Sequence, residues 1–259
     1  MDTEKALRLS KMLAYEAGAA IMDIYRQDFD VELKDDASPL TQADKAANDL
    51  ILAGLKAEFP DVAYLSEEEK DDFSRLKEKY CFIIDPLDGT KEFVKKNGEF
   101  TVNIALAKNG EPMMGVVYAP VLEELYFALK GAGAYLEDKD GHVTPLSVTS
   151  HTENLKLVAS KSHRSEKLDE MMEANKDKIT ELVSYGSSLK GCLVAAGSAD
   201  IYYRFGLTCE WDTCAMQAVV ECAGGIMMQM DKTPLTYNRE NTLNEKGFFI
   251  VNRKENIFV

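Results

Sequence analysis

Two aspartates three residues apart, Asp85 and Asp88, form the stretch with the clearest chemical potential in this chain. The apolar run at residues 81–84 predicts a buried strand leading into them, and residues 91–94 predict the first turn of a helix. A proline between the two acids fixes the backbone path, so the carbonyl oxygen of Leu87 is expected to converge with both carboxylates. Three oxygen ligands placed in this way suit a hard divalent cation.

The two residues after Asp88 suit a phosphate. Gly89 allows a phosphate to approach the backbone closely, and the amides of Gly89 and Thr90 at a helix start are expected to bind its oxygens. A plain turn is the alternative interpretation, since Asp-Pro and Asp-Gly are common turn dipeptides. A turn explains either dipeptide alone, but not a buried strand before the pair and a helix directly after it.

Three further acids are candidates, and each also has a structural explanation. Glu67 begins a run of three glutamates, for which a solvated surface is the simplest interpretation. Asp212, in Trp-Asp-Thr-Cys-Ala, fits an ordinary helix N-cap. Asp44 ends Thr-Gln-Ala-Asp, an acidic variant of the capping box, so a structural role competes with a catalytic one.

Hydrophobic periodicity divides the chain near residues 146–153. Residues 1–148 are predicted to pack helices, over 3–27 and from Thr41 to Pro60, on an antiparallel sheet. The second of these helices is expected to bury Ala46, Leu50, Leu55 and Phe59, and the charged segment 70–79 to be a solvated helix or loop. Residues 149–259 alternate strands and helices, which predicts a mixed α/β sheet.

Composition limits the class of partner. The net charge of −14 argues against nucleic acid or an anionic membrane as the main partner. The five cysteines are odd in number and form no C-x-x-C pair, so free thiols in a reducing compartment are expected. The N-terminus is charged, and no stretch is apolar enough to cross a bilayer, so we expect a cytoplasmic protein without an integral membrane segment.

Together these motifs resemble the inositol monophosphatase superfamily of metal-dependent, lithium-sensitive phosphatases. Residues 85–90 match its Asp-Pro-hydrophobic-Asp-Gly-Thr motif, and residues 65–68 and 211–215 match two others in the family's order. The resemblance implies a layered αβαβα sandwich and inhibition by Li⁺ and Ca²⁺. It implies two or three Mg²⁺ ions held by Glu67, Asp85, Leu87, Asp88 and Asp212.

The resemblance also implies a mechanism. The catalytic residues would be Asp44, Thr90 and Glu67. Asp44 would accept a hydrogen bond from Thr90, and the pair would orient and help deprotonate a water for in-line attack on a phosphate monoester. No arrangement of cysteine or histidine suggests a covalent intermediate.

Within the superfamily the chain is more similar to the bacterial CysQ type, the 3'(2'),5'-bisphosphate nucleotidases, over residues 88–106, 159–164, 186–190 and 203–206. This similarity implies hydrolysis of the 3'-phosphate of adenosine 3',5'-bisphosphate to AMP, which recycles a by-product of sulfate assimilation, with 3'-phosphoadenylyl sulfate as a second candidate substrate. Lys190 and Arg204 suit the second phosphate, with Ser187 donating a hydrogen bond. The expected substrate-binding residues are Glu67, Leu87, Asp88, Gly89, Thr90, His163, Ser187, Lys190, Arg204 and Asp212.

Two alternatives stay open at this point: an inositol monophosphatase, and a metal- or nucleotide-binding module without turnover. The presence of both Asp44 and Thr90 argues against the module, because only catalysis needs them. His163 has its own alternative as a surface residue at a helix start. A monomer or homodimer is expected, with peripheral association at the inner face of the membrane as an option that the resemblance leaves open.

Overall fold

The computed structural model describes residues 1–27, 39–161 and 165–259. Its first sheet has seven strands in sequence order: β1 (Ala63–Ser66), β2 (Tyr80–Asp88), β3 (Thr101–Lys108), β4 (Glu111–Ala119), β5 (Glu124–Leu129), β6 (Gly133–Glu137) and β7 (Val143–Pro145). All neighbours are antiparallel except β1 and β2, which run parallel. The predicted antiparallel sheet is therefore confirmed with one exception, because the chain between Ser66 and Tyr80 crosses back to start β2 at the same end as β1.

The second sheet is mixed, as predicted for the C-terminal half of the chain. Its order is β11 (Ile226–Gln229), β12 (Phe248–Val251), β10 (Ile201–Arg204), β8 (Leu155–Ser160) and β9 (Ile179–Tyr185). The pairs β8–β9 and β8–β10 are parallel, and both partners of β12 are antiparallel to it.

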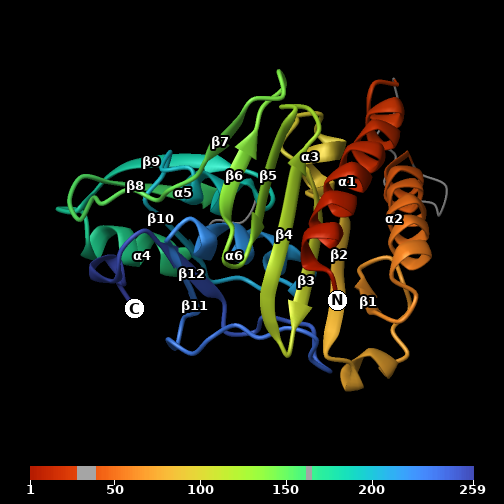
Figure 1. Cartoon of the computed structure of the whole chain (residues 1–259). Coiled ribbons are helices and arrows are strands. Elements are labelled where there is room, and N and C mark those ends of the chain that lie inside the picture. Colours follow the sequence, from red (N-terminus) through yellow and green to blue (C-terminus); the bar gives the residue numbers. More distant parts are fainter. Residues whose placement is uncertain (28–38, 162–164) are drawn as a thin grey trace.

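The helices separate and cover the two sheets (Figure 1). Helices α1 (Thr3–Tyr25) and α2 (Pro39–Glu58) lie side by side on the outer face of the first sheet, and α4 (Glu166–Ala174) packs outside the second. Helices α5 (Leu189–Ala195) and α6 (Glu210–Cys222) lie between the sheets, whose inner faces share one hydrophobic core with them. The predicted αβαβα sandwich is confirmed. None of the described helices is both long and apolar enough to span a membrane.

Three details of the N-terminal half differ from the predictions. Helix α2 begins at Pro39, so Asp44 lies in its second turn and not in a capping box. Leu55 and Phe59 are buried as predicted, but Leu50 is exposed and Ala46 half-buried, because the first part of the buried stripe runs through Ala43, Ala47 and Ile51, about one residue away from the predicted positions. In the charged segment, a short 3-10 helix (Ser74–Lys77) buries Arg75, whose guanidinium pairs with Asp71 at 2.6 Å.

Candidate active site

The two central aspartates reach the same side of β2 because the strand is irregular between them. Residues 81 and 83 face the inner core, and Phe82 and Ile84 face the outer one, as a strand's period of two requires. In a regular strand Asp85 and Asp88 would face opposite sides. The pairing of β2 with β3 instead shifts register between them, and the Leu87 side chain joins the outer core. Both carboxylates thus point to one site.

Strand β1 brings Glu67 to this site. Its last residue, Ser66, pairs with Ile84, and the next amide, of Glu67, donates to the Ile84 carbonyl at 3.2 Å. Asn48 on α2 holds this turn: it accepts from the Ser66 hydroxyl at 2.7 Å and donates to Glu69 at 2.9 Å. The Glu67 carboxyl is then near enough to Asp85 for each to influence the pKa of the other. Glu67 is exposed, as the surface interpretation predicted, and its carboxyl group also lies at the edge of the acidic cluster.

Asp212 comes from the first turn of α6. The predicted N-cap position is wrong by three residues, because the N-cap of α6 is Cys209; Asp212 is the third helical residue, and one of its carboxylate oxygens accepts from the Cys209 amide at 2.6 Å, as in a capping box. It also has a second role, because one carboxylate oxygen from each of Asp85, Asp88 and Asp212 lies within 4.8 Å of the others. A single cation can contact all three acids at this spacing.

The electrostatics of the site suit a cation. Burial raises the pKa of Glu67 and of Asp212 to about 7, and the charge of Asp88 adds to both shifts. Burial followed by the charges of Glu67, Asp88 and Asp212 raises the pKa of Asp85 as well. Carboxylates crowded in this way repel each other unless a cation neutralises them, and their all-oxygen donor set is the one that Mg²⁺ prefers.

Asp44 and Thr90 approach the cluster from the other side. Asp44 lies on α2, which packs against both β2 and α3 (Thr90–Val94), the helix that Thr90 begins. Burial, followed by the charges of Glu68 and Glu67, raises the pKa of Asp44 to about 8. No hydrogen bond joins the Asp44 and Thr90 side chains in the described structure, so the expected pairing of these two residues stays a prediction.

Gly89, between Asp88 and α3, occupies a position where a side chain does not fit. Its φ is 101°, in the left-handed region, and a Cβ there would lie 3.2 Å from the backbone of Phe100. This tight turn exposes Thr90 and sets α3 at the rim of a cavity of about 320 Å³.

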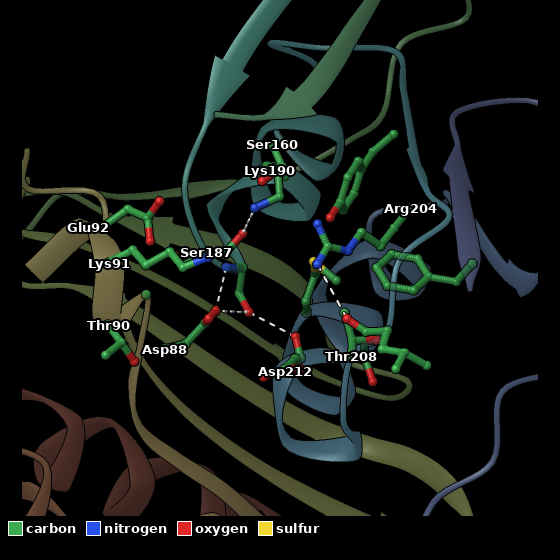
Figure 2. A pocket seen from close by; sticks show the side chains of 17 residues that line it. Asp88, Thr90, Lys91, Glu92, Ser160, Ser187, Lys190, Arg204, Thr208 and Asp212 are labelled. Carbon is green, nitrogen blue, oxygen red and sulfur yellow. Dashed lines mark hydrogen bonds between the residues drawn. The ribbon is translucent and has the colours of Figure 1, made fainter. Parts of the chain in front are cut away.

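The cavity has an acidic side and a basic side (Figure 2). Asp88, Thr90 and Asp212 line one side, and Lys190 and Arg204 line the other. The ammonium of Lys190 is buried and donates to the Ser187 carbonyl at 2.5 Å, and burial lowers its pKa to about 8. Arg204 donates to the Leu207 carbonyl at 3.3 Å, while its buried Nε has no hydrogen-bond partner. The basic side therefore has spare donors for an anion.

Several residues of the site were not identified from the sequence. Ser188 in the cavity wall, and Asn103 and Thr101 buried behind it, direct polar groups at Asp88, and apolar groups of Tyr202 and Phe248 complete the wall. Ser188 adjoins the predicted Ser187, but nothing in the local pattern distinguishes the two. The predicted ligand His163 lies outside the described residues.

The first turn of α6 is fixed by an ion pair between a buried glutamate and a half-buried arginine, which sequence reasoning also missed. Glu210, fully buried, accepts from the backbone amides of Asn238 and Arg239 at 2.6 and 2.9 Å and from the Arg239 side chain at 3.1 Å. The buried Arg75 guanidinium donates to the side-chain oxygen of Asn238 at 2.8 Å. These contacts tie the segment before β2 to the helix that carries Asp212.

Known proteins match this chain over almost its whole length. A model of the inositol monophosphatase family matches residues 2–256. The 3'(2'),5'-bisphosphate nucleotidase CysQ of Escherichia coli (strain K12) is 44% identical over 239 residues, covering 91% of this chain and 95% of that protein. The CysQ of Buchnera aphidicola is 41% identical over 242 residues, covering 92% and 90%.

Solved structures agree. The crystal structure of CysQ from Bacteroides thetaiotaomicron, described as a bacterial member of the inositol monophosphatase family, is 40% identical, with a TM-score of 0.88 over 96% of this chain and 98% of that one. An inositol monophosphatase from Zymomonas mobilis, 24% identical with a TM-score of 0.81 over 99% and 96%, shares the fold. The predicted resemblance is confirmed, and the chain belongs to the inositol monophosphatase family.

Proposed function

We propose that this protein is a Mg²⁺-dependent 3'(2'),5'-bisphosphate nucleotidase that hydrolyses the 3'-phosphate of adenosine 3',5'-bisphosphate to AMP and phosphate. The observation that carries the proposal is one cavity with carboxylates on one side and two cationic side chains, Lys190 and Arg204, on the other. A substrate with two phosphates needs a separate binding site for each phosphate. The likeness to CysQ proteins of that activity supports the same reaction.

The acidic side suits the reacting phosphate. Glu67, Asp85, Asp88 and Asp212, with the Leu87 carbonyl, would hold the Mg²⁺ ions. Bound Mg²⁺ supplies charge neutralisation for the phosphate and the leaving alkoxide, and lowers the pKa of water. The amides of Gly89 and Thr90 are the proposed donors to the phosphate oxygens.

Asp44 and Thr90 are the proposed proton acceptors for the attacking water. Burial and the neighbouring charges of Glu68 and Glu67 raise the pKa of Asp44, so its ionised carboxylate is a stronger base than an exposed aspartate. The α2–α3 contact keeps its helix beside Thr90. A merely structural role is weakened because Asp44 lies outside the first turn of α2.

The basic side suits the 5'-phosphate. Lys190 carries an ammonium within the cavity wall, and Arg204 offers the Nε proton that has no partner. A guanidinium binds two phosphate oxygens in parallel, so Arg204 gives geometric selection for a second phosphate. Inositol 1-phosphate has no second phosphate, and a site of this kind gains nothing from binding it there.

The decisive experiment determines which phosphate is released from the substrate. The purified protein with Mg²⁺ is incubated with adenosine 3',5'-bisphosphate, adenosine 3'-phosphate and inositol 1-phosphate, with EDTA as the control. We expect fast release of phosphate from the bisphosphate, 5'-AMP as the only nucleotide product on chromatography, and no release with EDTA. Faster turnover of inositol 1-phosphate, or 3'-AMP as the product, would refute the proposal.

Further aspects of the proposal follow from the family. We propose inhibition by Li⁺ and Ca²⁺ at the Mg²⁺ positions, and a cytoplasmic location that fits the five free cysteines. 3'-Phosphoadenylyl sulfate is included as a second substrate, because its sulfate enlarges only the group on the 5' side. Comparing kcat/KM for the two nucleotides ranks them.

A further inference from the structure

Ser188 lies between the Asp88 carboxylate and the main chain of Asp212. Its hydroxyl is 2.9 Å from Oδ2 of Asp88 and 3.0 Å from the main-chain carbonyl oxygen of Asp212. Its amide also donates to Oδ2 of Asp88, at 2.7 Å. Ser188 is buried, with 2% of its surface exposed, so water does not compete for these bonds. One residue thus joins strand β2 to helix α6.

An ordinary helix cap does not explain Ser188. It stands at the N-cap position of α5, where serine is a preferred residue because its hydroxyl accepts from the helix amides. Here the hydroxyl makes no such capping bond and is directed at the acids instead. The preceding Ser187 has a φ of 43°, in the left-handed region, and the Gly186 amide is held by Glu99 at 2.8 Å. The loop is therefore constrained to present Ser188 in this position.

The hydrogen bonds around Ser188 form one connected network at Asp88. A hydroxyl has a single proton, so that of Ser188 serves Asp88 or the Asp212 carbonyl at any moment. It accepts at the same time from the side-chain amide of Asn103, at 3.0 Å. Asn103 is fully buried, and its amide also lies 3.4 Å from Oδ2 of Asp88. All of these donors converge on Oδ2, which leaves Oδ1 of Asp88 for a cation.

We propose that Ser188 is a positioning residue that fixes Asp88 relative to Asp212, and so sets the affinity of the protein for its metal ions. The inference rests on the proposed metal-dependent activity. Groups that orient a metal's carboxylate ligands commonly change affinity by about 10–100-fold when removed. The Ser188 amide and hydroxyl are both directed at Asp88 or the Asp212 carbonyl, so its effect should be on metal binding before any substrate is present.

The test measures metal binding without substrate. Trp211 is the single tryptophan and precedes Asp212, so Tb³⁺ bound at the cluster should emit when this indole is excited. Titration with Tb³⁺, followed by displacement with Mg²⁺, gives both affinities. We expect Ser188→Ala to weaken both by about tenfold or more. Ser10→Ala is the matched control, because Ser10 is a buried serine whose hydroxyl has no partner, and its affinities should equal those of the wild type.

A double-mutant cycle distinguishes loss of the Asp88 orientation from a general disturbance of the fold. Ser188→Ala and Asn103→Ala act on the same carboxylate oxygen, so their combined loss of metal affinity should be smaller than the product of the single losses. Unchanged Mg²⁺ affinity in Ser188→Ala, or independent effects of the two substitutions, would overturn the inference. So would a variant that loses thermal stability in EDTA but binds Mg²⁺ normally.

The outcome is independent of the proposed reaction. If the wild type releases no phosphate from adenosine 3',5'-bisphosphate, the proposed function fails, while the Tb³⁺ and Mg²⁺ titrations still decide the role of Ser188. If hydrolysis occurs and Ser188→Ala binds Mg²⁺ like the wild type, only the positioning role fails. For an active enzyme, raising the Mg²⁺ concentration should restore most of the kcat of Ser188→Ala.

Discussion

Replacing Arg204 by alanine tests the assignment of the two phosphates to two sides of one cavity. In the structure this guanidinium makes one long hydrogen bond, at 3.3 Å to the Leu207 carbonyl, and its buried Nε has none. At least two of its N–H groups are therefore available to a 5'-phosphate. Hydrogen bonds to charged groups contribute about 1.5 kcal/mol or more each, so two of them contribute about 3 kcal/mol.

That energy predicts a specific pattern of rates. About 3 kcal/mol corresponds to a loss of roughly 150-fold in kcat/KM for adenosine 3',5'-bisphosphate. Adenosine 3'-phosphate lacks the group that Arg204 binds, so its kcat/KM should change by less than about threefold. Arg204→Lys keeps the charge without the planar pair of donors and should recover only a fraction of the loss.

The assay is phosphate release from both nucleotides at saturating Mg²⁺, for the wild type and each variant. Arg253→Ala is the matched control, because Arg253 is exposed and lies outside the cavity, and it should leave both rates unchanged. If Arg204→Ala lowers kcat/KM equally for the two nucleotides, the guanidinium does not bind the 5'-phosphate. If it slows neither, the basic side of the cavity has another role.

Four further predictions concern the acidic side. Asp44→Asn should fold and bind Mg²⁺ but lose at least about 100-fold in kcat, as expected for loss of a general base; unchanged activity would leave Asp44 without a catalytic role. Li⁺ at millimolar or lower levels should inhibit hydrolysis less as Mg²⁺ is raised, which steady-state kinetics will detect, and insensitivity to Li⁺ would contradict the proposed metal sites. Because the pKa values of Glu67 and Asp212 are raised to about 7, Mg²⁺ affinity should fall as pH is lowered through that value, measured by calorimetry. Because these two pKa values are raised, the metal-free folded protein binds more protons than the unfolded chain between about pH 4 and about pH 7. In EDTA its melting temperature should therefore fall as the pH is raised over this range. An increase in melting temperature would contradict the pKa shifts.

The architecture and the grouping of the acids were predictable from the sequence. Asp85, Asp88, Glu67 and Asp212 were chosen from short motifs, and the structure brings oxygens of three of them within 4.8 Å of one another and the fourth near Asp85. The sandwich was predictable because helices and strands leave periodic patterns of apolar residues in the chain. The pattern was less exact for α2, where the first part of the buried face was placed about one residue off because the run Leu50, Ile51 and Leu52 does not show which apolar residue faces the core.

The sequence could not indicate which polar residues support those acids. Ser188 meets Asp88 across 100 positions of chain, and Arg75 meets Asn238 across 163. Such contacts depend on how two sheets and the helices between them pack, and single serines, asparagines and arginines carry no local periodic signal of that packing. The Asp85 and Asp88 side chains lie on the same face of β2 because the register shifts between β2 and β3, which is a property of the paired strands and not of β2 alone. The types and spacing of residues in short segments therefore determined which groups are candidates to bind metal and phosphate. Tertiary packing decided how these groups are oriented, because their orientation arises from contacts between segments far apart in the chain.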